Sequence, residues 1–284
     1  MFKIALIVGG TNTKCALFEG NRIVKKIKSP THVEKGKFFM IDNIIKMIEN
    51  IKENKKISGI GMGVPGPIDR KRGVISNPPN IPWRNVPLKK IIQRKFRTKV
   101  AIENDAKCAA LGVLARKKTK NFILFTLGTG VGGAIVTDGK LYTGMGNAGE
   151  LGHVTIEKDG LKCNCGNMGC LEEYVAARGF ERLAKKYFGK RLSPLELERM
   201  AKKGDKKAKR IYNEVGEYLG IGLANIGNAF NPETIYFTGK ISRSGPLLLE
   251  PARKEMAKRI FVKPPKLKMA EEEAELYGAA SLIK

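Results

Sequence analysis

The chain has 284 residues, 42% of them hydrophobic, which is enough to bury one large core or two ordinary ones. Lys and Arg number 53 against 27 Asp and Glu, and the formal net charge of +26 would attract polyanions, including a phosphorylated cosubstrate. The basic residues fall in many small groups without a helix-turn-helix, zinc-finger or aromatic RNA-binding motif, so we expect a solvated basic surface and no specific nucleic-acid partner.

No stretch of the chain predicts a secretion signal or a membrane span. The first apolar run, Ile4 to Val8, is too short for a signal-peptide core, and no later run approaches the length of a bilayer. We therefore expect a cytoplasmic protein that does not bind membranes. Of the five cysteines, Cys15 and Cys108 are typical of small buried residues in a reducing compartment.

The first half of the chain predicts an α/β unit, because short apolar runs alternate with glycine turns and one clear helical pattern. We expect the chain to begin with a strand (3–8), a tight turn (9–13) and a hairpin (15–18 and 22–28). A helix with isoleucines at 41, 44, 45, 48 and 51 should follow, and then a strand (57–63) and two ordered proline-rich loops (64–69 and 77–83). The half should end with a strand (100–103) and a helix through residues 109, 110 and 113 that Asp105 could cap.

The second half repeats this plan, with a strand at 122–127, a glycine turn at 128–133 and a hairpin at 134–137 and 140–143. This duplication predicts two similar α/β lobes that face one another across a cleft, with the glycine turns at its mouth. We expect a small lobe (1–118), on which the C-terminal helix (274–284) packs back, and a large lobe (119–273). The large lobe should add helices at 173–187, 194–202 and 206–228, a strand at 234–237 and a helix after Pro246. Four glycines inside the third helix suggest close approach to another backbone or a ligand.

One imidazole and three thiols lie within eighteen residues, in the pattern His-x9-Cys-x-Cys-x4-Cys formed by His153, Cys163, Cys165 and Cys170. Glycines at 160, 166 and 169 would let the backbone turn around a small ion. Four such donors leave no open coordination position, so the spacing predicts a structural zinc site that shapes the neighbouring carboxylates, Glu150 and Glu172.

The two glycine turns could present backbone N–H groups to phosphate oxygens, or could be ordinary hairpin turns. Asp105 follows a strand and could act as a general base on a sugar hydroxyl, or simply cap the next helix. The chain contains neither a P-loop nor a dinucleotide-binding fingerprint, which disfavours the other common phosphate sites.

Seven motifs together resemble the ROK family of repressors and sugar kinases, in the order of that family and over essentially the whole chain. They are Gly9-Gly10-Thr11-Asn12-Thr13-Lys14, Pro65-Gly66-Pro67, Asn80-Ile81-Pro82-Trp83, Glu103-Asn104-Asp105, Leu127 to Gly133, Gly149-Glu150-Leu151-Gly152-His153 and Cys163 to Glu172. The resemblance implies a two-lobed actin-like ATPase (ribonuclease H-like) fold with a duplicated βββαβα core, and ATP-dependent phosphorylation of a hexose.

The resemblance also implies roles for individual residues. Asp105 would be the catalytic base, and His153 would turn its second ring edge toward the sugar. Sugar ligands would be Gly66, Asn104, Asp105, Glu150, His153 and Glu172. ATP would be held by Gly9, Gly10, Thr11, Asn12, Lys14, Gly128, Thr129, Gly130, Gly132, Gly133 and Gly239, with Mg²⁺ on the nucleotide and Zn²⁺ on His153, Cys163, Cys165 and Cys170.

The chain departs from the family pattern at two points. The family usually has Asp-Ile-Gly-Gly-Thr at the first turn, where the aspartate helps to organise magnesium, but Ile7 stands here and cannot bind a metal. The adenosine segment, often a glycine run, is Thr238-Gly239-Lys240. Because Ile7 cannot bind magnesium, the ion would be held by phosphates, water and other side chains, or turnover would be impaired.

The leading hypothesis is a glucokinase that phosphorylates the 6-hydroxyl of glucose. The alternatives are a kinase for N-acetylmannosamine, N-acetylglucosamine or fructose, a sugar-sensing regulator, and a sugar-binding module with weak catalysis. Against the regulator, the first strand begins at residue 3 and leaves no room for a preceding helix-turn-helix. Dimers are frequent among such relatives, so a homo-oligomer is expected.

Overall fold

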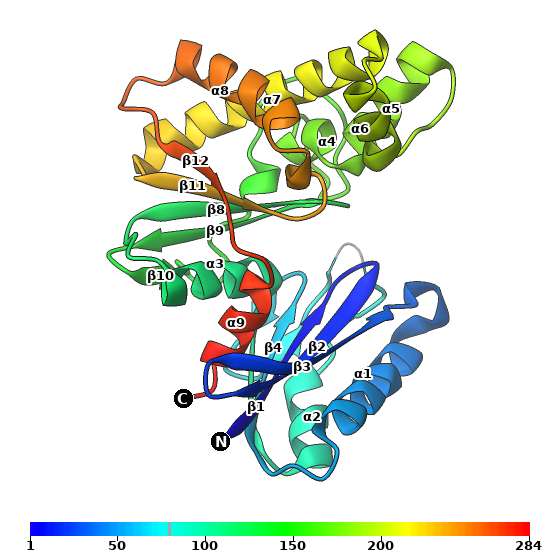
Figure 1. The fold of residues 1–284 in the computed structure, drawn as a ribbon, viewed down its shortest axis with the longest axis vertical. Helices are drawn as coiled ribbons and strands as arrows, with labels where there is room; N and C mark the ends of the chain where they lie inside the picture. The colour runs from blue at the N-terminus through cyan, green and yellow to red at the C-terminus, as the bar shows by residue number, and fades with distance from the viewer. Residues whose placement is uncertain (79–80) are drawn as a thin grey trace. The chain divides into compact units, whose positions relative to one another are not determined.

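The computed structural model, which describes residues 1–78 and 81–284, contains two mixed five-stranded sheets with the same strand order (Figure 1). Each sheet has an antiparallel hairpin on one side of its first strand and parallel strands on the other. The predicted α/β class and internal duplication are therefore confirmed. In the first sheet the strands lie in the order β3 (Arg22–Pro30), β2 (Asn12–Glu19), β1 (Phe2–Val8), β4 (Ile57–Val64) and β7 (Lys99–Asn104). In the second sheet the order is β10 (Lys140–Tyr142), β9 (Val131–Thr137), β8 (Phe122–Leu127), β11 (Thr234–Thr238) and β12 (Lys266–Met269).

The chain divides into two compact units. Unit 1 comprises residues 1–118, 139–148 and 271–284, and unit 2 comprises residues 119–138 and 149–270. We expected residues 139–148 in the second lobe, but they cluster with unit 1. The reason lies at Gly146, whose carbonyl accepts hydrogen bonds from Nη1 of Arg70 and from Nζ of Lys107, the latter at 3.2 Å.

The sheet of unit 1 is buried on both faces, because alternate residues of β1 pack on opposite sides. Ile4, Leu6 and Val8 join one core with α1 (Gly36–Lys52) and α2 (Leu88–Phe96). Ala5 and Ile7 join another with α3 (Asp105–Arg116) and α9 (Ala274–Ser281). Figure 1 shows these helix pairs on the two faces. The short helix α2 and the two-residue strands β5 (Ile68–Asp69) and β6 (Val74–Ile75) were not predicted.

Helix α9 packs on α3 through glycines that remove the barrier to close approach. A Cβ at Gly278 would lie 1.7 Å from the carbonyl oxygen of Cys108, and one at Gly112 would lie 1.8 Å from the carbonyl oxygen of Ala274. Only hydrogen atoms fit at either position. The C-terminal helix thus lies against the helix that Asp105 begins.

In unit 2 the helices gather over one face of the sheet (Figure 1), where Ile123, Phe125 and Leu127 form a core with them. They are α4 (Leu171–Val175), α5 (Ala177–Phe188), α6 (Pro194–Lys202), α7 (Lys206–Phe230) and α8 (Pro246–Arg259). The predicted helix 173–187 is in fact split, because Ala176 is extended with ψ 176°. The close approach expected from the glycines of α7 is confirmed: a Cβ at Gly220 would lie 2.6 Å from the carbonyl oxygen of Ala252 in α8.

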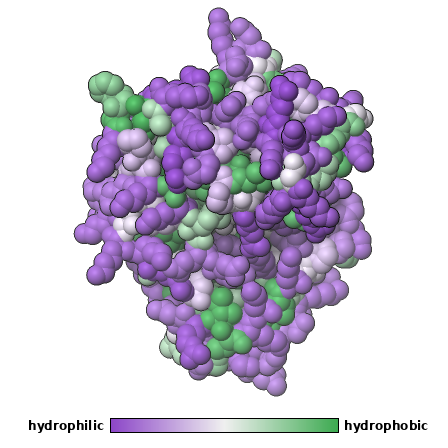
Figure 2. Space-filling model, turned by 45° about the horizontal axis from the view of Figure 1, so that its top comes forward, coloured by the Kyte–Doolittle hydropathy of each residue, from purple (hydrophilic) through white to green (hydrophobic). Residues whose placement is uncertain are grey.

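Hydrophilic side chains dominate the face shown in Figure 2, with smaller hydrophobic patches among them. Across residues 1–78 and 81–284, no helix combines the length and apolarity needed to cross a membrane. Of the loop predicted at 77–83, Pro79 and Asn80 lie outside the described residues, while Ile81 and Trp83 are buried in the first core.

Candidate functional site

Three parallel strands of unit 1 bring the predicted site residues to one edge of the sheet. Strands β1, β4 and β7 are parallel and in register, with Ile7 opposite Gly63 and Gly63 opposite Glu103. Their carboxyl ends lead directly into Gly9, into Pro65-Gly66 and into Asp105. Ligands of open α/β sheets bind at this edge, so the topology gathers these residues where a substrate would lie.

Asn104, and not Asp105, caps helix α3. Its Oδ1 accepts hydrogen bonds from the N–H groups of Ala106 at 3.0 Å and Lys107 at 3.2 Å, while Asp105 begins the helix. Because Oδ1 is already committed, Asn104 would use its Nδ2 group to bind a hydroxyl. The capping alternative does not account for Asp105, whose Oδ1 accepts the neighbouring N–H of Ala106 at 2.9 Å.

A buried ion pair lies next to these residues. Nε and Nη2 of Arg70 donate to the two carboxylate oxygens of Glu103 at 2.6 and 2.9 Å, and Oε1 of Glu103 also accepts the N–H of Asn104 at 2.8 Å. Glu103 is only 6% exposed. Sequence reasoning missed Arg70 and Lys107, although a charged residue within the apolar strand 100–103 was a signal for a buried partner.

The first glycine turn is closed by its own backbone. The N–H of Gly9 donates to the carbonyl of Asn12 at 3.0 Å, and the hydroxyl of Thr31 donates to the carbonyl of Gly9 at 2.7 Å. Thr11 is exposed and lies at the tip. The structure therefore places Gly9 in a structural role and leaves Gly10 and Thr11 at the end of the turn.

Two side chains near this turn differ from a phosphate-binding arrangement. Lys14 forms ion pairs with Glu275 at 2.6 Å and Glu273 at 3.6 Å in and beside α9. Ile7, opposite Lys14 in the β1–β2 ladder, is 7% exposed and packs in the core that contains Cys108 and Leu276. Ile7, which stands where the family has an aspartate, is thus an apolar side chain with apolar neighbours.

Gly66 requires the absence of a side chain. Its φ is +84°, and a Cβ there would lie 2.6 Å from Cβ of Pro78. A substitution would push the loop after β4, which contains Gly66, away from Pro78. Gly66 can therefore line a pocket only through its backbone.

The second glycine turn is shorter than predicted, because β9 begins at Val131 and takes up Gly132 and Gly133. The N–H of Gly128 donates to the carbonyl of Gly130 at 3.0 Å, and that of Gly132 donates to Oγ1 of Thr126 at 3.0 Å. Within the described part of the chain, the N–H groups of Thr129 and Gly130 at the tip have no such acceptor. They are the donors that this turn can offer to a ligand.

Gly239 lies against the base of the same turn. Strands β8 and β11 are parallel and end together, so Gly239 follows β11 as Gly128 follows β8. Its φ is +99°, and a Cβ there would lie 2.3 Å from the carbonyl oxygen of Leu127. The N–H of Ile241 donates to that same carbonyl at 3.1 Å. The structure therefore brings two of the predicted ATP-binding segments together in unit 2.

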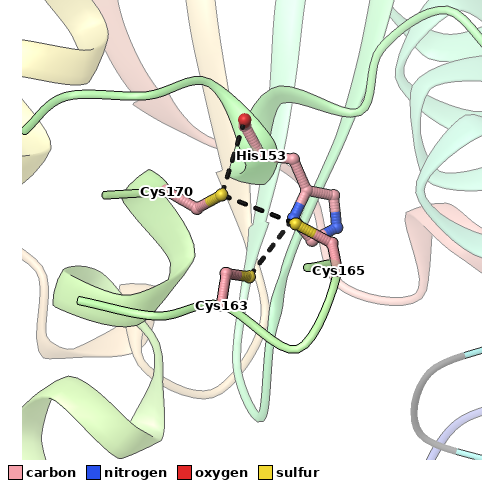
Figure 3. A group of neighbouring side chains, drawn as sticks. All are labelled: His153, Cys163, Cys165 and Cys170. Atoms are coloured by element: carbon pink, nitrogen blue, oxygen red, sulfur yellow. Dashed lines mark hydrogen bonds between the residues drawn. The ribbon is translucent and has the colours of Figure 1, made fainter. Parts of the chain in front are cut away.

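The predicted metal ligands also come together in unit 2 (Figure 3). The donor atoms of His153, Cys163, Cys165 and Cys170 all lie within 4.8 Å of one another. Nδ1 of His153 is 3.7 Å from Sγ of Cys163, and the Sγ atoms of Cys165 and Cys170 are 3.6 Å apart. Since Nδ1 faces the thiols, Nε2 lies on the opposite edge of the ring.

Glycines allow the chain to fold around this cluster. Gly166 and Gly169 have φ of +96° and +68°, and a Cβ at Gly169 would lie 1.6 Å from the carbonyl oxygen of Glu157. Burial raises the pKa of Cys163 to about 12, whereas the backbone N–H of Asn167 lowers the pKa of Cys165. Burial favours the protonated form of Cys163 and Cys170, and a bound cation would stabilise these two thiols as thiolates.

The two carboxylates beside the cluster have different surroundings. Glu150 is exposed and precedes the short helix η2 (Leu151–His153). Glu172, in α4, is 8% exposed; its Oε2 accepts the N–H of Val131 at 2.7 Å, and its Oε1 lies 3.3 Å from Nη2 of Arg178. Sequence reasoning predicted Glu172 as a sugar ligand but missed its bond to the glycine turn and its partner Arg178.

Comparisons with known proteins cover nearly the whole chain. The profile described as the ROK family matches residues 3–284. The glucokinase of Thermotoga maritima is 35% identical over 306 residues, 99% of this chain and 96% of that protein. A xylose repressor of Caldicellulosiruptor bescii is 36% identical, over 78% of this chain and 60% of the repressor. A ROK family glucokinase from Streptomyces griseus, crystallised with glucose and AMPPNP, matches with a TM-score of 0.88 and 30% identity, over 100% of this chain and 99% of that one.

Proposed function

Because this chain belongs to the ROK family, we propose that it is an ATP-dependent hexose kinase whose substrate is glucose. The observation that carries the proposal is the full-length match to a glucokinase crystallised with both glucose and an ATP analogue. In the reaction, O6 of the sugar forms a bond to the γ-phosphorus as the bond to the bridging oxygen breaks, and ADP leaves. The proton of the hydroxyl must go to a base.

We assign that base to Asp105, at the carboxyl edge of the unit 1 sheet. Asn104 takes over the capping of α3, which supports a catalytic rather than a structural role for the neighbouring carboxylate. A positioned general base contributes about 10²–10⁴-fold to the rate. The hydroxyls of the sugar would be bound by Asn104, Glu150, His153 and Glu172, with Gly66 contributing backbone.

The nucleotide would be bound by the two glycine turns and Gly239. The tip donors of the second turn, Thr129 and Gly130, suit phosphate oxygens, and Gly239 packs against Leu127, the residue that precedes this turn. The ion pair of Lys14 with Glu275 argues for a smaller part for Lys14 than the family resemblance implies. Mg²⁺ would accompany ATP, and Ile7 offers it no ligand.

The residues of the cluster suit a structural zinc ion. A tetrahedral ion with Zn–S bonds of 2.3 Å places its sulfurs about 3.8 Å apart, and the pair Cys165–Cys170 is separated by 3.6 Å. Zinc would close the loop 153–170 and fix the ring of His153 by Nδ1, leaving Nε2 for a sugar hydroxyl. It would supply no chemistry to the phosphoryl transfer itself.

Kinases for fructose or N-acetylhexosamines remain alternatives, and the similarity to a xylose repressor favours a second candidate, a sugar-sensing regulator without catalysis. A coupled assay of ADP release with glucose, fructose, mannose, N-acetylglucosamine and N-acetylmannosamine, with and without Mg²⁺, separates these functions. We expect Mg²⁺-dependent ADP release that is fastest with glucose. Binding of a sugar without ADP release from any of them would contradict the kinase and favour the regulator.

A further inference from the structure

The metal cluster and the second glycine turn meet at one carboxylate, that of Glu172. A carboxylate oxygen of Glu172 lies within 4.8 Å of the sulfur of Cys163, in a group that also includes Glu173. Oε2 of Glu172 accepts the N–H of Val131 at 2.7 Å in a buried, charge-assisted hydrogen bond. Glu172 therefore stands between a predicted metal ligand and the residue that ends the turn.

Two backbone contacts connect the same segments. The N–H of Ala177, at the start of α5, donates to the carbonyl of Gly128 at 3.0 Å. On the other side of the cluster, a Cβ at Gly152 would lie 2.3 Å from the carbonyl oxygen of Val131. Residues on either side of the segment that carries the four metal ligands, Gly152 and Ala177, thus contact the two ends of the turn.

We propose that Glu172 is a positioning residue that couples the metal cluster to the glycine turn. The occupied cluster holds the carboxylate of Glu172 against Val131, and this hydrogen bond orders the turn for the phosphates of ATP. The inference rests on the proposed nucleotide role of the turn, but it goes beyond the assignment of Glu172 as a sugar ligand. It predicts that metal occupancy affects nucleotide binding even when no sugar is present.

The physical basis is the position of Glu172 two residues after Cys170. The ligand Cys170 immediately precedes α4, and the N–H of Leu171 donates to the carbonyl of Val154 at 3.0 Å, so the cluster fixes where the helix starts. Without the ion, the glycines at 166 and 169 allow the loop many conformations. The start of α4, and with it the carboxylate, then loses its anchor.

The first experiment measures hydrogen exchange of the Val131 amide in the full-length protein, before and after removal of Zn²⁺ by a chelator and again after Zn²⁺ is restored. We expect exchange to become at least about tenfold faster without Zn²⁺ and to recover when it is added back, as for the loss of one hydrogen bond to a charged group. Exchange at Val131 that does not respond to Zn²⁺ would overturn the proposal. This measurement needs no substitution and no catalytic activity.

The second experiment measures AMPPNP affinity by calorimetry in the absence of sugar. Glu172→Ala removes the acceptor and should weaken AMPPNP binding about tenfold, whereas Glu172→Gln retains an acceptor and should stay within about twofold of the original affinity. The effects of Glu172→Ala and Cys165→Ser should not add in the double variant, because both act through one contact. Weaker glucose binding with unchanged AMPPNP binding would make Glu172 a sugar ligand only.

Glu173→Gln is the matched control. Glu173 is 7% exposed, lies beside Cys163 and pairs with the same Arg178 at 2.9 Å, but Glu172 supplies the carboxylate that the turn contacts. Glu173→Gln should leave the hydrogen exchange of Val131 and the AMPPNP affinity unchanged. If it changed them as much as Glu172→Ala does, the coupling would come from the charge near the cluster, and the role of Glu172 would be refuted. If the original protein binds no AMPPNP, the proposed function fails, while the exchange experiment still decides whether the cluster orders the turn.

Discussion

Arg70 holds both carboxylate oxygens of Glu103, with Nε 2.6 Å from Oε2 and Nη2 2.9 Å from Oε1, while the same carboxylate accepts the N–H of Asn104. Arg70→Ala would leave a buried negative charge without its partner. Because the side chain of Arg70 is 27% exposed and water can partly replace it, we expect a loss of about 2–4 kcal/mol in the free energy of unfolding. Urea unfolding measures this loss.

The double variant Arg70→Ala/Glu103→Leu is the control for this pair. Removing both charges leaves no unpaired group, so it should recover part of the stability lost in Arg70→Ala. Phosphorylation should still fall in the double variant, since the N–H of Asn104 loses its acceptor next to Asp105. Full activity in the double variant would show that the pair serves stability alone.

Asp105→Asn should bind glucose with nearly the original affinity and phosphorylate it about 10²–10⁴-fold more slowly, because an amide cannot accept the hydroxyl proton. Calorimetry with glucose and the coupled assay measure the two quantities. Asp69→Asn provides a control, since Asp69 lies in the same unit, in the two-residue strand β5, and is exposed. Turnover comparable to the original protein in Asp105→Asn would remove Asp105 from the base role.

The sequence motifs predicted residues that lie close together within each unit, because strand ends and metal ligands have strong local signals. The strand before Asp105, the glycine turns and the Cys and His spacing all depend on near neighbours in the chain. What escaped prediction depends on contacts between distant segments. Lys14 was expected at a phosphate, yet its ammonium pairs with Glu275, which is 261 residues away. No local pattern contains that pairing.

Element boundaries failed where tertiary contacts override local propensity. The glycines at 132 and 133 suggested a turn, but pairing with Thr126 and Phe125 places them in β9. The pattern of residues 173–187 predicted one helix. In the structure the N–H of Ala177 donates to the carbonyl of Gly128, and Ala176 has an extended backbone conformation that interrupts the helix. Capping was one of two roles considered for Asp105 because aspartate caps well, but the equally suitable Asn104 precedes it and caps the helix.

Cys165→Ser should release the metal and lower the melting temperature. Cys165 is exposed, so the substitution disturbs no core packing, but it removes one of four donors. Structural zinc contributes binding free energy of about 10 kcal/mol or more in small zinc domains, and part of that is lost with a ligand. Elemental analysis should find one zinc per chain in the original protein and in the control Cys15→Ala, and much less in Cys165→Ser. A variant that loses the metal yet melts and binds glucose normally would contradict the scaffold role.

Glu273 should contribute to the acid sensitivity of the protein. Burial alone would raise the pKa of Glu273, but the hydrogen bond from Lys26 and the charge of Lys14 outweigh it and hold the pKa below its ordinary value. A carboxyl with a lowered pKa stabilises the fold above its unfolded pKa of about 4.3, and this stabilisation is lost as the pH falls through the folded pKa. Glu273→Gln should melt at a lower temperature than the original protein at pH 6, and the difference should shrink toward pH 3.

The exposed Glu217 of α7 provides a charge control for this experiment. Glu217→Gln changes the net charge by the same amount, so comparison with it removes the general effect of charge. A difference between Glu273→Gln and the original protein that stays constant from pH 6 to pH 3 would refute the linkage.

Gly278→Ala should separate α9 from α3. The added Cβ would lie 1.7 Å from the carbonyl oxygen of Cys108, which is rigid backbone inside a helix, so the two helices must move apart. We expect a loss of about 3 kcal/mol or more in the free energy of unfolding, at the upper end for overpacked cores. Gly189→Ala is the control: Gly189 follows the last residue of α5, at φ +71°, with no neighbour within 4 Å among the described residues, and the substitution should cost only about 1 kcal/mol. Because α3 begins at Asp105, kcat should fall in Gly278→Ala and remain unchanged in Gly189→Ala. If the two variants were equally stable, α9 could shift along α3 without a loss of stability, and the prediction would be wrong.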